Sequence, residues 1–406
     1  MELFVSSSST VRVWDARSGA ETWCGQNVVP QSRTLCQYCP GAVVCAANAQ
    51  AQLQFLSLGK KPDYSGCRSA CWEPLRSAAV TVDGIFCAGG SASGKIYIWN
   101  IASGELLRLW EAHYSEVSVL KFTDDAQFLI SAEAHAYIKV WGLCDAVDLT
   151  NAAGSRAAPQ PRRVWSSHTL PITDMVLGAG GLCSRIVSSS DDQSVSVWSL
   201  ASGNRLASVR FPSKCSAIAM DSAERDMFVG CADGNIYAMS LSAAPTEHFV
   251  SVGEHCGRDD AFRGHVQTVT ALALGVDGSI LLSASSDATI RVWDVRCRTA
   301  IRLFERHRGT VTDILPLGLH ASRGLALHLS LDRCFYSTPS NRAMCCKPFL
   351  KTMNRSSNVV AAEVPLKLVD GSPGVLTHRR WGARASHSIG WADDVGIVPN
   401  CADVDL

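Results

Sequence analysis

The most regular feature of the chain is a short run of alternating apolar and polar residues that recurs along it. Each copy begins with small residues, crosses a polar gap and ends in an alternating run that closes on a large side chain. "SASGKIYIWNIASG" and "SASSDATIRVWDV" are the clearest copies. Since successive side chains of a strand point to opposite faces, a period of two indicates β-strands. No segment before residue 340 has convincing helical periodicity, so we expect an all-β fold.

The closing side chains are spaced like the units of a repeat. In chain order they are Trp14, Phe55, Trp99, Trp141, Trp198, Met239 and Trp293. Successive positions are 41, 44, 42, 57, 41 and 54 residues apart, and a four-stranded propeller blade takes about 40–45 residues. The two long intervals contain insertions, at 144–163 and within 242–262. The spacing therefore predicts a seven-bladed β-propeller.

A propeller ring closes when one blade is built from both ends of the repeat region. We expect the N-terminal segment to supply the outer strands of a blade whose innermost strand lies in 309–317, because closure removes free sheet edges. His307 and Asp332 suggest one more, degenerate unit, so an eight-bladed ring is the alternative. Hairpin turns are indicated by the pairs Ser18-Gly19, Ser103-Gly104 and Ser202-Gly203.

The pattern divides the chain into two parts. We predict the propeller over residues 1–339 and an irregular C-terminal extension over residues 340–406. The extension shows no heptad of apolar residues and contains several Gly and Pro breaks. We therefore expect it to be flexible.

Polar residues also recur at fixed places, and the unit that ends at Trp293 has the fullest set. Gly264-His265 opens this unit, Ser283 and Asp287 follow, and Trp293-Asp294 closes it. In these residues the chain resembles the WD-repeat family. The resemblance implies that the His, Ser, Asp and Trp side chains form a buried hydrogen-bonded network. Such a network would fix strand register, which alternation alone leaves free to slip.

Other units keep parts of the same set. His168, Asp192 and Trp198 match in one unit. His113 and Trp141 match in another, where His135 stands at the acidic position. Asp233 precedes Met239 by six residues, as Asp287 precedes Trp293. We expect all of these residues except His135 to belong to the structural networks.

Charge and cysteine content narrow the class of protein. Lys plus Arg and Asp plus Glu both number 37, so only local basic patches could favour nucleic acid. The 17 cysteines are scattered and mostly lie in apolar runs, which is typical of free, buried thiols in a reducing compartment. The N-terminus lacks the pattern of a secretory signal, and no run reaches 18 apolar residues. We expect a soluble protein.

Two motifs resemble ligand sites but lack essential parts. Gly89, Gly94 and Lys95 have nearly the spacing of a phosphate-binding loop, yet Ile96 replaces the required Ser or Thr and "IYIW" is a strand pattern. Cys36 and Cys39 have the spacing of half a zinc site, but the sequence has no second pair at a suitable distance. We therefore expect no cofactor, no metal and no enzymatic activity.

One insertion is a candidate contact loop. It contains Arg156, Arg162 and Arg163 around a Pro- and Ala-rich stretch, which indicates a surface loop. The three arginines could contact a protein partner or an RNA backbone, while the simpler reading is a solvated loop.

Residues 85–315 resemble more closely the WD-repeat subunit family of the rixosome, a eukaryotic complex that acts on the large (pre-60S) ribosomal subunit. The distinctive parts are His113-Tyr114, the stretch Trp165–Asp174 and "AMDSAERDMFVG". The resemblance implies a nuclear and nucleolar scaffold that binds helical-repeat (α-solenoid) subunits and docks on pre-60S particles. It also implies a part in internal transcribed spacer 2 processing and an indirect link to an AAA ATPase. Replication licensing and heterochromatin are further roles of that family.

Members of that family self-associate through a C-terminal helix, and the extension shows no heptad pattern for one, which leaves homodimerisation open. Two other functions also remain open. The first is an adaptor or substrate receptor of another nuclear complex, such as a ubiquitin ligase. The second is an enzyme with a site in the propeller channel, since a fold alone does not exclude catalysis.

Overall fold

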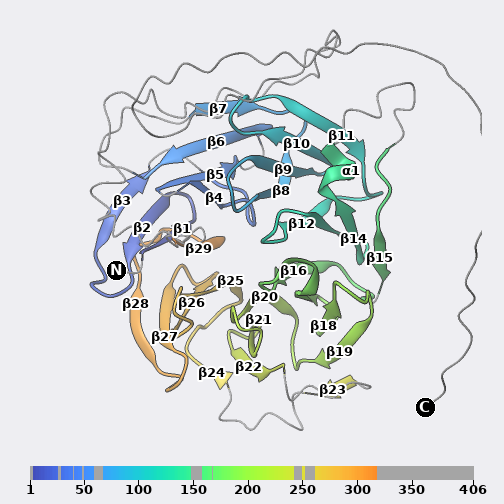
Figure 1. The fold of residues 1–406 in the computed structure, drawn as a ribbon. Helices are drawn as coiled ribbons and strands as arrows, with labels where there is room; N and C mark the ends of the chain where they lie inside the picture. The colour runs from blue at the N-terminus through green and yellow to red at the C-terminus, as the bar shows by residue number, and fades with distance from the viewer. Residues whose placement is uncertain are drawn as a thin grey trace, which may run out of the picture. The chain divides into compact units, whose positions relative to one another are not determined.

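The computed structural model describes residues 3–317 except the short segments 26–28, 40, 48–49, 59–66, 148–157, 167, 242–248 and 252–260. Seven β-sheets surround a common axis in this part of the chain (Figure 1). The seven-bladed, nearly all-β fold predicted from the repeat spacing is confirmed. The predicted boundary between residues 339 and 340, the whole C-terminal extension and Asp332 lie outside the described residues.

We number the blades by their closing residues, so that blade 1 contains Trp14 and blade 7 contains Trp293. Every blade has its strands in the same order from the axis outwards. The first three blades comprise β29 (Asp313–Leu317), β1 (Leu3–Ser7), β2 (Val11–Asp15) and β3 (Glu21–Gly25); β4 (Cys36–Cys39), β5 (Ala42–Ala46), β6 (Gln52–Ser57) and β7 (Cys67–Ala70); and β8 (Leu75–Val80), β9 (Phe86–Ser91), β10 (Lys95–Asn100) and β11 (Leu106–Glu111).

The other four blades follow the same plan. They comprise β12 (Val117–Phe122), β13 (Phe128–Glu133), β14 (Tyr137–Gly142) and β15 (Arg163–Ser166); β16 (Ile172–Leu177), β17 (Arg185–Ser190), β18 (Ser194–Ser199) and β19 (Arg205–Arg210); β20 (Cys215–Met220), β21 (Asp226–Cys231), β22 (Ile236–Ser240) and β24 (Ala261–Phe262); and β25 (Val269–Leu274), β26 (Ile280–Ser285), β27 (Ile290–Asp294) and β28 (Ala300–Phe304). Each closing residue lies on the third strand of its blade, as the alternation predicts.

Both insertions contain secondary structure that the alternation does not reveal. The first begins with a short helix, α1 (Leu143–Val147), whose Leu143 and Ala146 are buried against blades 3 and 4. Five residues are too few to show a helical period in the sequence, and the same holds for the 3-10 helix η3 (Gly181–Cys183) between β16 and β17. The second insertion supplies β23 (Phe249–Ser251), which pairs in parallel with β19 as a fifth strand of blade 5.

The hydrophobic core lies between neighbouring blades. Seven clusters of buried apolar side chains each join two adjacent blades within the described residues. Trp99 of blade 3, for example, packs in one cluster with Phe55 of blade 2, and Trp14 of blade 1 packs with Phe304 of blade 7. Each blade therefore depends on both neighbours for the burial of its two faces.

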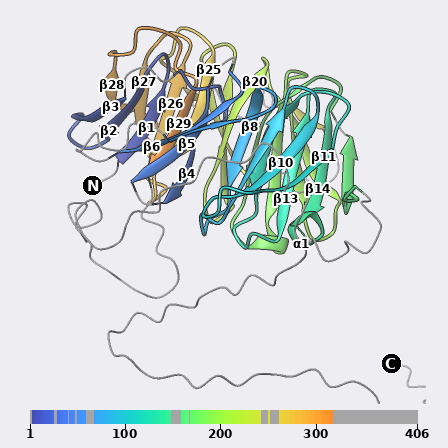
Figure 2. The same cartoon turned by 90° about the horizontal axis from the view of Figure 1, so that it is seen from above.

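The ring closes through a sheet made from distant parts of the chain. The innermost strand β29 pairs antiparallel with β1, with Val5 opposite Leu315, and Figure 2 shows the two strands side by side. The predicted closure by 309–317 is correct. His307 belongs to this blade and not to an additional unit, since it lies in the loop that leads into β29 and contacts β1.

The buried imidazole of His307 links the two ends of the described chain. Its Nε2 lies 2.9 Å from Ser6 Oγ and its Nδ1 lies 2.8 Å from Ser8 Oγ. Trp14 Nε1 donates to the same Ser6 Oγ at 2.8 Å. Ser8 stands six residues before Trp14, the place that an aspartate takes in the fullest repeat, so a hydroxyl replaces the carboxylate here.

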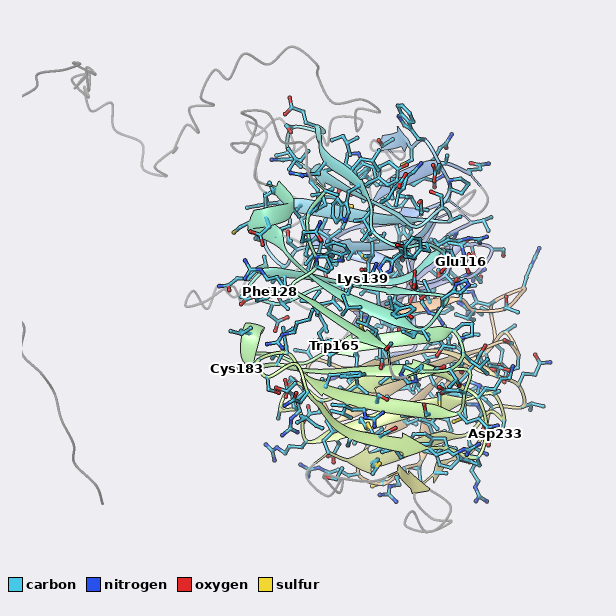
Figure 3. The ribbon with its side chains drawn as sticks, turned by 90° about the vertical axis from the view of Figure 1, so that its right-hand side faces the viewer. Glu116, Phe128, Lys139, Trp165, Cys183 and Asp233 are labelled. Carbon is cyan, nitrogen blue, oxygen red and sulfur yellow. The ribbon has the colours of Figure 1, made fainter. Side chains whose placement is uncertain are left out.

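The ring has two faces, and Figure 3 shows it from the side. One face carries the loops that lead into the innermost strands, including Glu116, and also the turn of Asp233. We call it the histidine face, because those loops hold His113, His168, His265 and His307. The opposite face carries Cys183 and the start of β13 at Phe128. No helix among the described residues is long and apolar enough to cross a membrane.

We predict that His307 makes the ring sensitive to acid. Burial, and to a smaller extent Arg12, lowers the pKa of His307 to about 4, whereas an unfolded histidine titrates near 6.5. Between these values only the unfolded chain takes up the proton, so the stability that is fully present above pH 6.5 is lost as the pH falls towards 4. From pH 7 to pH 5 this site should cost roughly 1–2 kcal/mol.

Urea unfolding of the wild type and of His307→Gln at both pH values measures this effect. The wild type should lose more stability on acidification than the variant. Equal losses in the two proteins would show that His307 titrates normally in the folded ring.

Candidate interaction site

In blade 7 the structure brings together the full set of repeat residues. His265 Nε2 lies 2.7 Å from Ser283 Oγ, which also accepts a hydrogen bond of 2.8 Å from Trp293 Nε1. On the other side of the imidazole, His265 Nδ1 lies 3.1 Å from Asp287 Oδ2. The same carboxylate oxygen accepts the backbone N–H of Val266 at 3.2 Å. The network thus ties the loop before β25 to strands β26 and β27.

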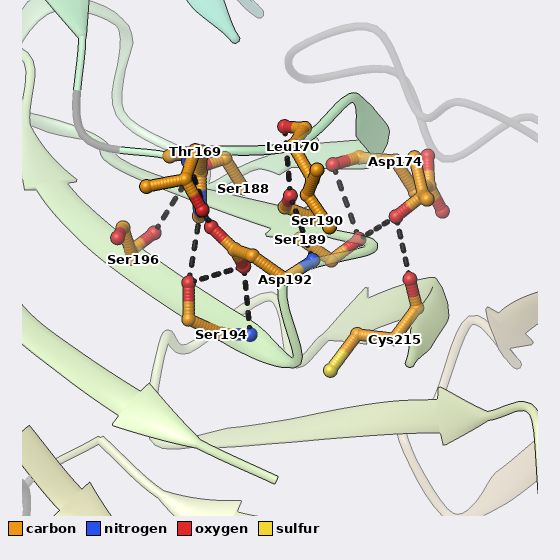
Figure 4. A network of polar contacts seen from close by, with 12 residues as sticks. Thr169, Leu170, Asp174, Ser188, Ser189, Ser190, Asp192, Ser194, Ser196 and Cys215 are labelled. Carbon is orange, nitrogen blue, oxygen red and sulfur yellow. Dashed lines mark hydrogen bonds and ion pairs between the residues drawn. The ribbon is translucent and has the colours of Figure 1, made fainter. Parts of the chain in front are cut away.

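Blade 5 repeats this arrangement with its own residues, and Figure 4 shows part of it. His168 Nε2 lies 2.9 Å from Ser188 Oγ, to which Trp198 Nε1 donates at 3.3 Å. His168 Nδ1 lies 3.2 Å from Asp192 Oδ2, which accepts the backbone N–H of Thr169 at 3.1 Å. The loop before β16 is therefore held in the same way as the loop before β25.

In blade 4 the acidic partner is not at the expected position. His113 Nε2 lies 2.6 Å from Ser131 Oγ, and Trp141 Nε1 donates to that oxygen at 2.8 Å. His113 Nδ1 lies 3.2 Å from Glu133 Oε2, and this oxygen accepts the backbone N–H of Tyr114 at 3.2 Å. Glu133 therefore occupies the role that Asp192 and Asp287 have in blades 5 and 7.

His135 stands at the repeat's acidic position in the sequence, but its side chain is exposed. The longer side chain of Glu133 reaches the histidine from two residues earlier, at the end of β13. The repeat pattern did not reveal Glu133, because it places the acidic residue six positions before the tryptophan, where His135 stands. An acidic residue within the small-residue stretch "SAEAHAY" was the available signal.

Asp233 takes no part in a buried histidine network among the described residues. It is exposed and accepts hydrogen bonds from the backbone N–H of Asn235 at 3.0 Å and from Tyr237 Oη at 3.1 Å. In its blade Phe211 stands four residues before the innermost strand, where blade 7 has His265. The expectation for Asp233 is corrected: it organises the turn between β21 and β22 at the surface.

The networks contain Ser, His and Asp, but their environment does not suit catalysis. Ser283 and Ser188 are fully buried, and each hydroxyl oxygen already accepts an indole N–H. Burial lowers the pKa of His265, although Asp287 opposes this effect. Burial would raise the pKa of Asp287, but hydrogen bonds from Thr289 and His265 lower it below its usual value. At neutral pH a neutral imidazole therefore faces a charged carboxylate, and no substrate reaches the serine.

The candidate contact loop is only partly described, and its described arginines have partners within the chain. Arg156 lies outside the described residues. Arg162 forms an ion pair with Asp145 of α1 at 3.0 Å, on the opposite face. Arg163 donates to the carbonyl oxygen of Ser202 in blade 5 at 2.8 Å. Arg162 and Arg163 therefore fasten the insertion to the ring, and the structure does not present them as a shared contact surface.

The two incomplete ligand motifs lie in sheet structure. Gly94 is in the turn between β9 and β10 with a φ of +86°, and an added Cβ would collide with the backbone of His113. Lys95 begins β10 and forms an ion pair with Glu73 at 2.9 Å. Cys36 and Cys39 both lie in β4. The described part of the chain contains no group of three His, Cys, Asp or Glu side chains placed to hold a metal.

Four exposed apolar side chains lie on loops of the histidine face. Trp72 is 58% exposed, Tyr114 99%, Leu170 46% and Val266 85%, and we call these four the histidine-face set. Each lies in the loop that leads into the innermost strand of its blade. Exposed aromatic and apolar side chains on rigid loops are typical of protein-binding surfaces.

The buried networks position two members of this set directly. Tyr114 and Val266 follow the network histidines, and their backbone N–H groups donate to Glu133 and Asp287. Lys139 Nζ also lies 5.7 Å from the centre of the Tyr114 ring. The polar networks thus hold apolar side chains outwards, where a partner can cover them.

We predict that Glu133 is required for stability and that His135 is not. Glu133→Ala leaves the buried His113 without its acidic partner, and losing one buried polar partner costs roughly 1–3 kcal/mol. His135→Ala changes an exposed side chain and should alter stability by less than about 0.5 kcal/mol. Urea unfolding at pH 7 compares the two variants, and a larger loss in His135→Ala would contradict the assignment of Glu133.

Comparison with known proteins shows that the chain matches a family of repeat proteins. The family model described as "WD domain, G-beta repeat" matches residues 104–142, 159–199 and 256–294. A crystal structure of the computationally designed Ika8 protein has a similar fold, with a TM-score of 0.54 and 23% identity over 77% of this chain and 86% of that one.

Natural relatives are more informative. The chain is 34% identical to "Pre-rRNA-processing protein IPI3" of Yarrowia lipolytica, over 62% of this chain and 59% of the relative. It is also 34% identical to "WD repeat-containing protein 18" of Bos taurus, over 309 residues that cover 74% of this chain and 70% of the relative. On the strength of this identity and of the matched repeats, the chain belongs to the family of WD repeat-containing protein 18.

Proposed function

We propose that this chain is a non-enzymatic scaffold subunit of a nuclear complex that acts in assembly of the large ribosomal subunit. Its family includes a relative named for pre-rRNA processing, which supports a role in ribosome biogenesis. The finer parts of the proposal are action on the internal transcribed spacer 2 region and residence in the nucleolus and nucleoplasm. The observation that carries the scaffold role is a closed ring whose buried networks hold the strongly exposed Tyr114 and Val266 outwards on the histidine face.

The burial of the polar sets supports a binding function over a catalytic one. Ser131, Ser188 and Ser283 are each enclosed between strands, and their hydroxyl oxygens are occupied by tryptophan N–H groups. The same networks hold backbone N–H groups of the histidine-face loops. These polar side chains would therefore serve to fix the loops, and not to form a reactive centre.

Helical-repeat subunits of the same complex are the proposed partners of the histidine face. The loops of blades 3, 4, 5 and 7 each offer one exposed apolar side chain, and an α-solenoid has a long surface that can contact several loops together. Nucleotide chemistry would belong to an AAA ATPase that meets the assembled complex. The segment that resembles a phosphate-binding loop leads into strand β10, which agrees with nucleotide chemistry on another protein.

Affinity purification of the tagged chain followed by mass spectrometry tests the proposal. Helical-repeat subunits and large-subunit precursors should be recovered together. Cullin adaptors without ribosomal precursors, combined with normal rRNA processing after depletion, would favour the adaptor or substrate-receptor function and contradict the proposal.

A second purification tests the histidine face. The variant Trp72→Ala/Tyr114→Ala/Val266→Ala should reduce recovery of helical-repeat partners at least tenfold, since it removes most of the apolar contact surface. The matched control is Val82→Ala/Leu182→Ala/Val276→Ala, which truncates exposed apolar side chains on turns of the opposite face. Equal recovery with both variants would show that partners bind elsewhere.

A further inference from the structure

Positive charge is concentrated in one short segment of a chain that is neutral overall. Residues 296–308 contain five of the 37 basic residues and one of the 37 acidic residues, giving this segment a net charge of +4. Because the whole chain has a net charge of zero, the rest of it carries −4. All five basic residues are arginines: Arg296, Arg298, Arg302, Arg306 and Arg308. This local charge has no part in the repeat networks.

The structure spreads the arginines along the outer edge of blade 7. Arg296 and Arg298 lie in the turn before β28, Arg302 lies within the strand, and Arg306 and Arg308 follow in the loop towards β29. All five side chains are exposed. With a rise of about 3.3 Å per residue, β28 itself spans roughly 13 Å along this edge. We call this row the arginine stripe.

Nearby acidic groups offset part of the stripe's charge, and the one acidic residue of the segment, Glu305, leaves its net charge at +4. Asp294 accepts the backbone N–H groups of Arg296 and Cys297, which caps its own turn. Glu21 of blade 1 lies 3.1 Å from Arg12 and 3.5 Å from Arg306, so it is shared between two guanidinium groups.

Beside the stripe lies a cavity between blades 7 and 1. Its volume is about 340 Å³, and its wall includes Arg302 and Arg306 together with Ser18, Gly19 and the acidic Glu305. Figures 1 and 2 both place β28 next to β2 and β3. An ideal Cβ at Gly19 would lie 2.8 Å from a guanidinium nitrogen of Arg302, so this side chain rests on the turn. Exposed Arg17 extends the positive surface from the same turn.

We propose that the arginine stripe and the adjoining cavity bind the phosphodiester backbone of RNA. Guanidinium groups bind phosphate oxygens through two parallel hydrogen bonds, which a lysine ammonium cannot do. A row of five arginines suits a polymer with regularly spaced charges, and phosphate contacts position a nucleic acid without reading its sequence. The choice of RNA as the polyanion rests on the proposed function in ribosome assembly. The binding should therefore be independent of sequence and strongly dependent on salt.

Fluorescence anisotropy with a short labelled single-stranded RNA of mixed sequence measures this binding for the purified full chain. The affinity is measured across a range of salt concentrations. The test variant changes four arginines to glutamine, namely Arg296, Arg298, Arg306 and Arg308. Arg302 is kept because it packs on Gly19. Each lost phosphate contact reduces the slope of log affinity against log salt by about 0.7, so the slope should fall by roughly 3.

A matched control variant removes the same charge from blades 5 and 6. It changes four other exposed basic residues to glutamine, namely Arg205, Arg210, Lys214 and Arg225. This variant should keep the affinity and the salt slope of the wild type. Thermal unfolding should change only slightly in both variants, since all eight residues are exposed and an exposed ion pair, such as Arg306–Glu21, contributes at most about 1 kcal/mol.

The outcomes separate the alternatives. No RNA binding by the wild type, or an equal loss in the two variants, would overturn the proposal. If the test variant loses binding to poly-glutamate and keeps RNA binding, the stripe binds an acidic protein and the RNA proposal is wrong. Because purified components are used, RNA binding can fail while pre-60S particles are still recovered by affinity purification. Failure of that recovery would count against the proposed function alone.

Discussion

The pairing of β29 with β1 is the constraint on which the rest of the structure depends. Each blade is a sheet with two apolar faces, and each of the seven core clusters is shared by two neighbouring blades. An open row of blades would leave an apolar face exposed at each end. By joining residues 313–317 to residues 3–7, the chain covers both faces at once. The buried His307 adds a polar link across the same junction.

The closed ring explains how buried polar networks fix the conformation of loops on the surface. A Ser-His-Asp or Ser-His-Glu set would suggest catalysis if it were open to solvent, but here burial and the tryptophan N–H groups assign it to structure. The carboxylates also hold the backbone at Tyr114, Thr169 and Val266. Loops fixed in this way lose little conformational entropy when a partner binds. A scaffold for other proteins is the function that this arrangement suits.

Much of the fold could be predicted because it follows from alternation and spacing, which are local properties of the sequence. The blade count, the third-strand position of each closing residue and the closure by β29 are of this kind. The predictions of network residues failed where side-chain length or the absence of a partner, and not residue spacing, decided the contact. Glu133 reaches His113 because its side chain is longer, whereas Asp233 has no histidine to meet. Likewise, no pattern reveals that Arg163 donates to Ser202 or that Tyr114 is almost fully exposed, since both depend on how distant segments pack.

Hydrogen–deuterium exchange on a Val5→Pro variant tests the dependence on ring closure most directly. Val5 is buried in β1 and pairs with both Val13 and Leu315, so proline removes a ladder hydrogen bond at the junction. Val5→Ala is the control, because it keeps the backbone N–H. In the proline variant, protection should fall in all seven blades, including blade 4, which is far from the junction in the ring. Loss confined to β29, β1, β2 and β3 would contradict the account.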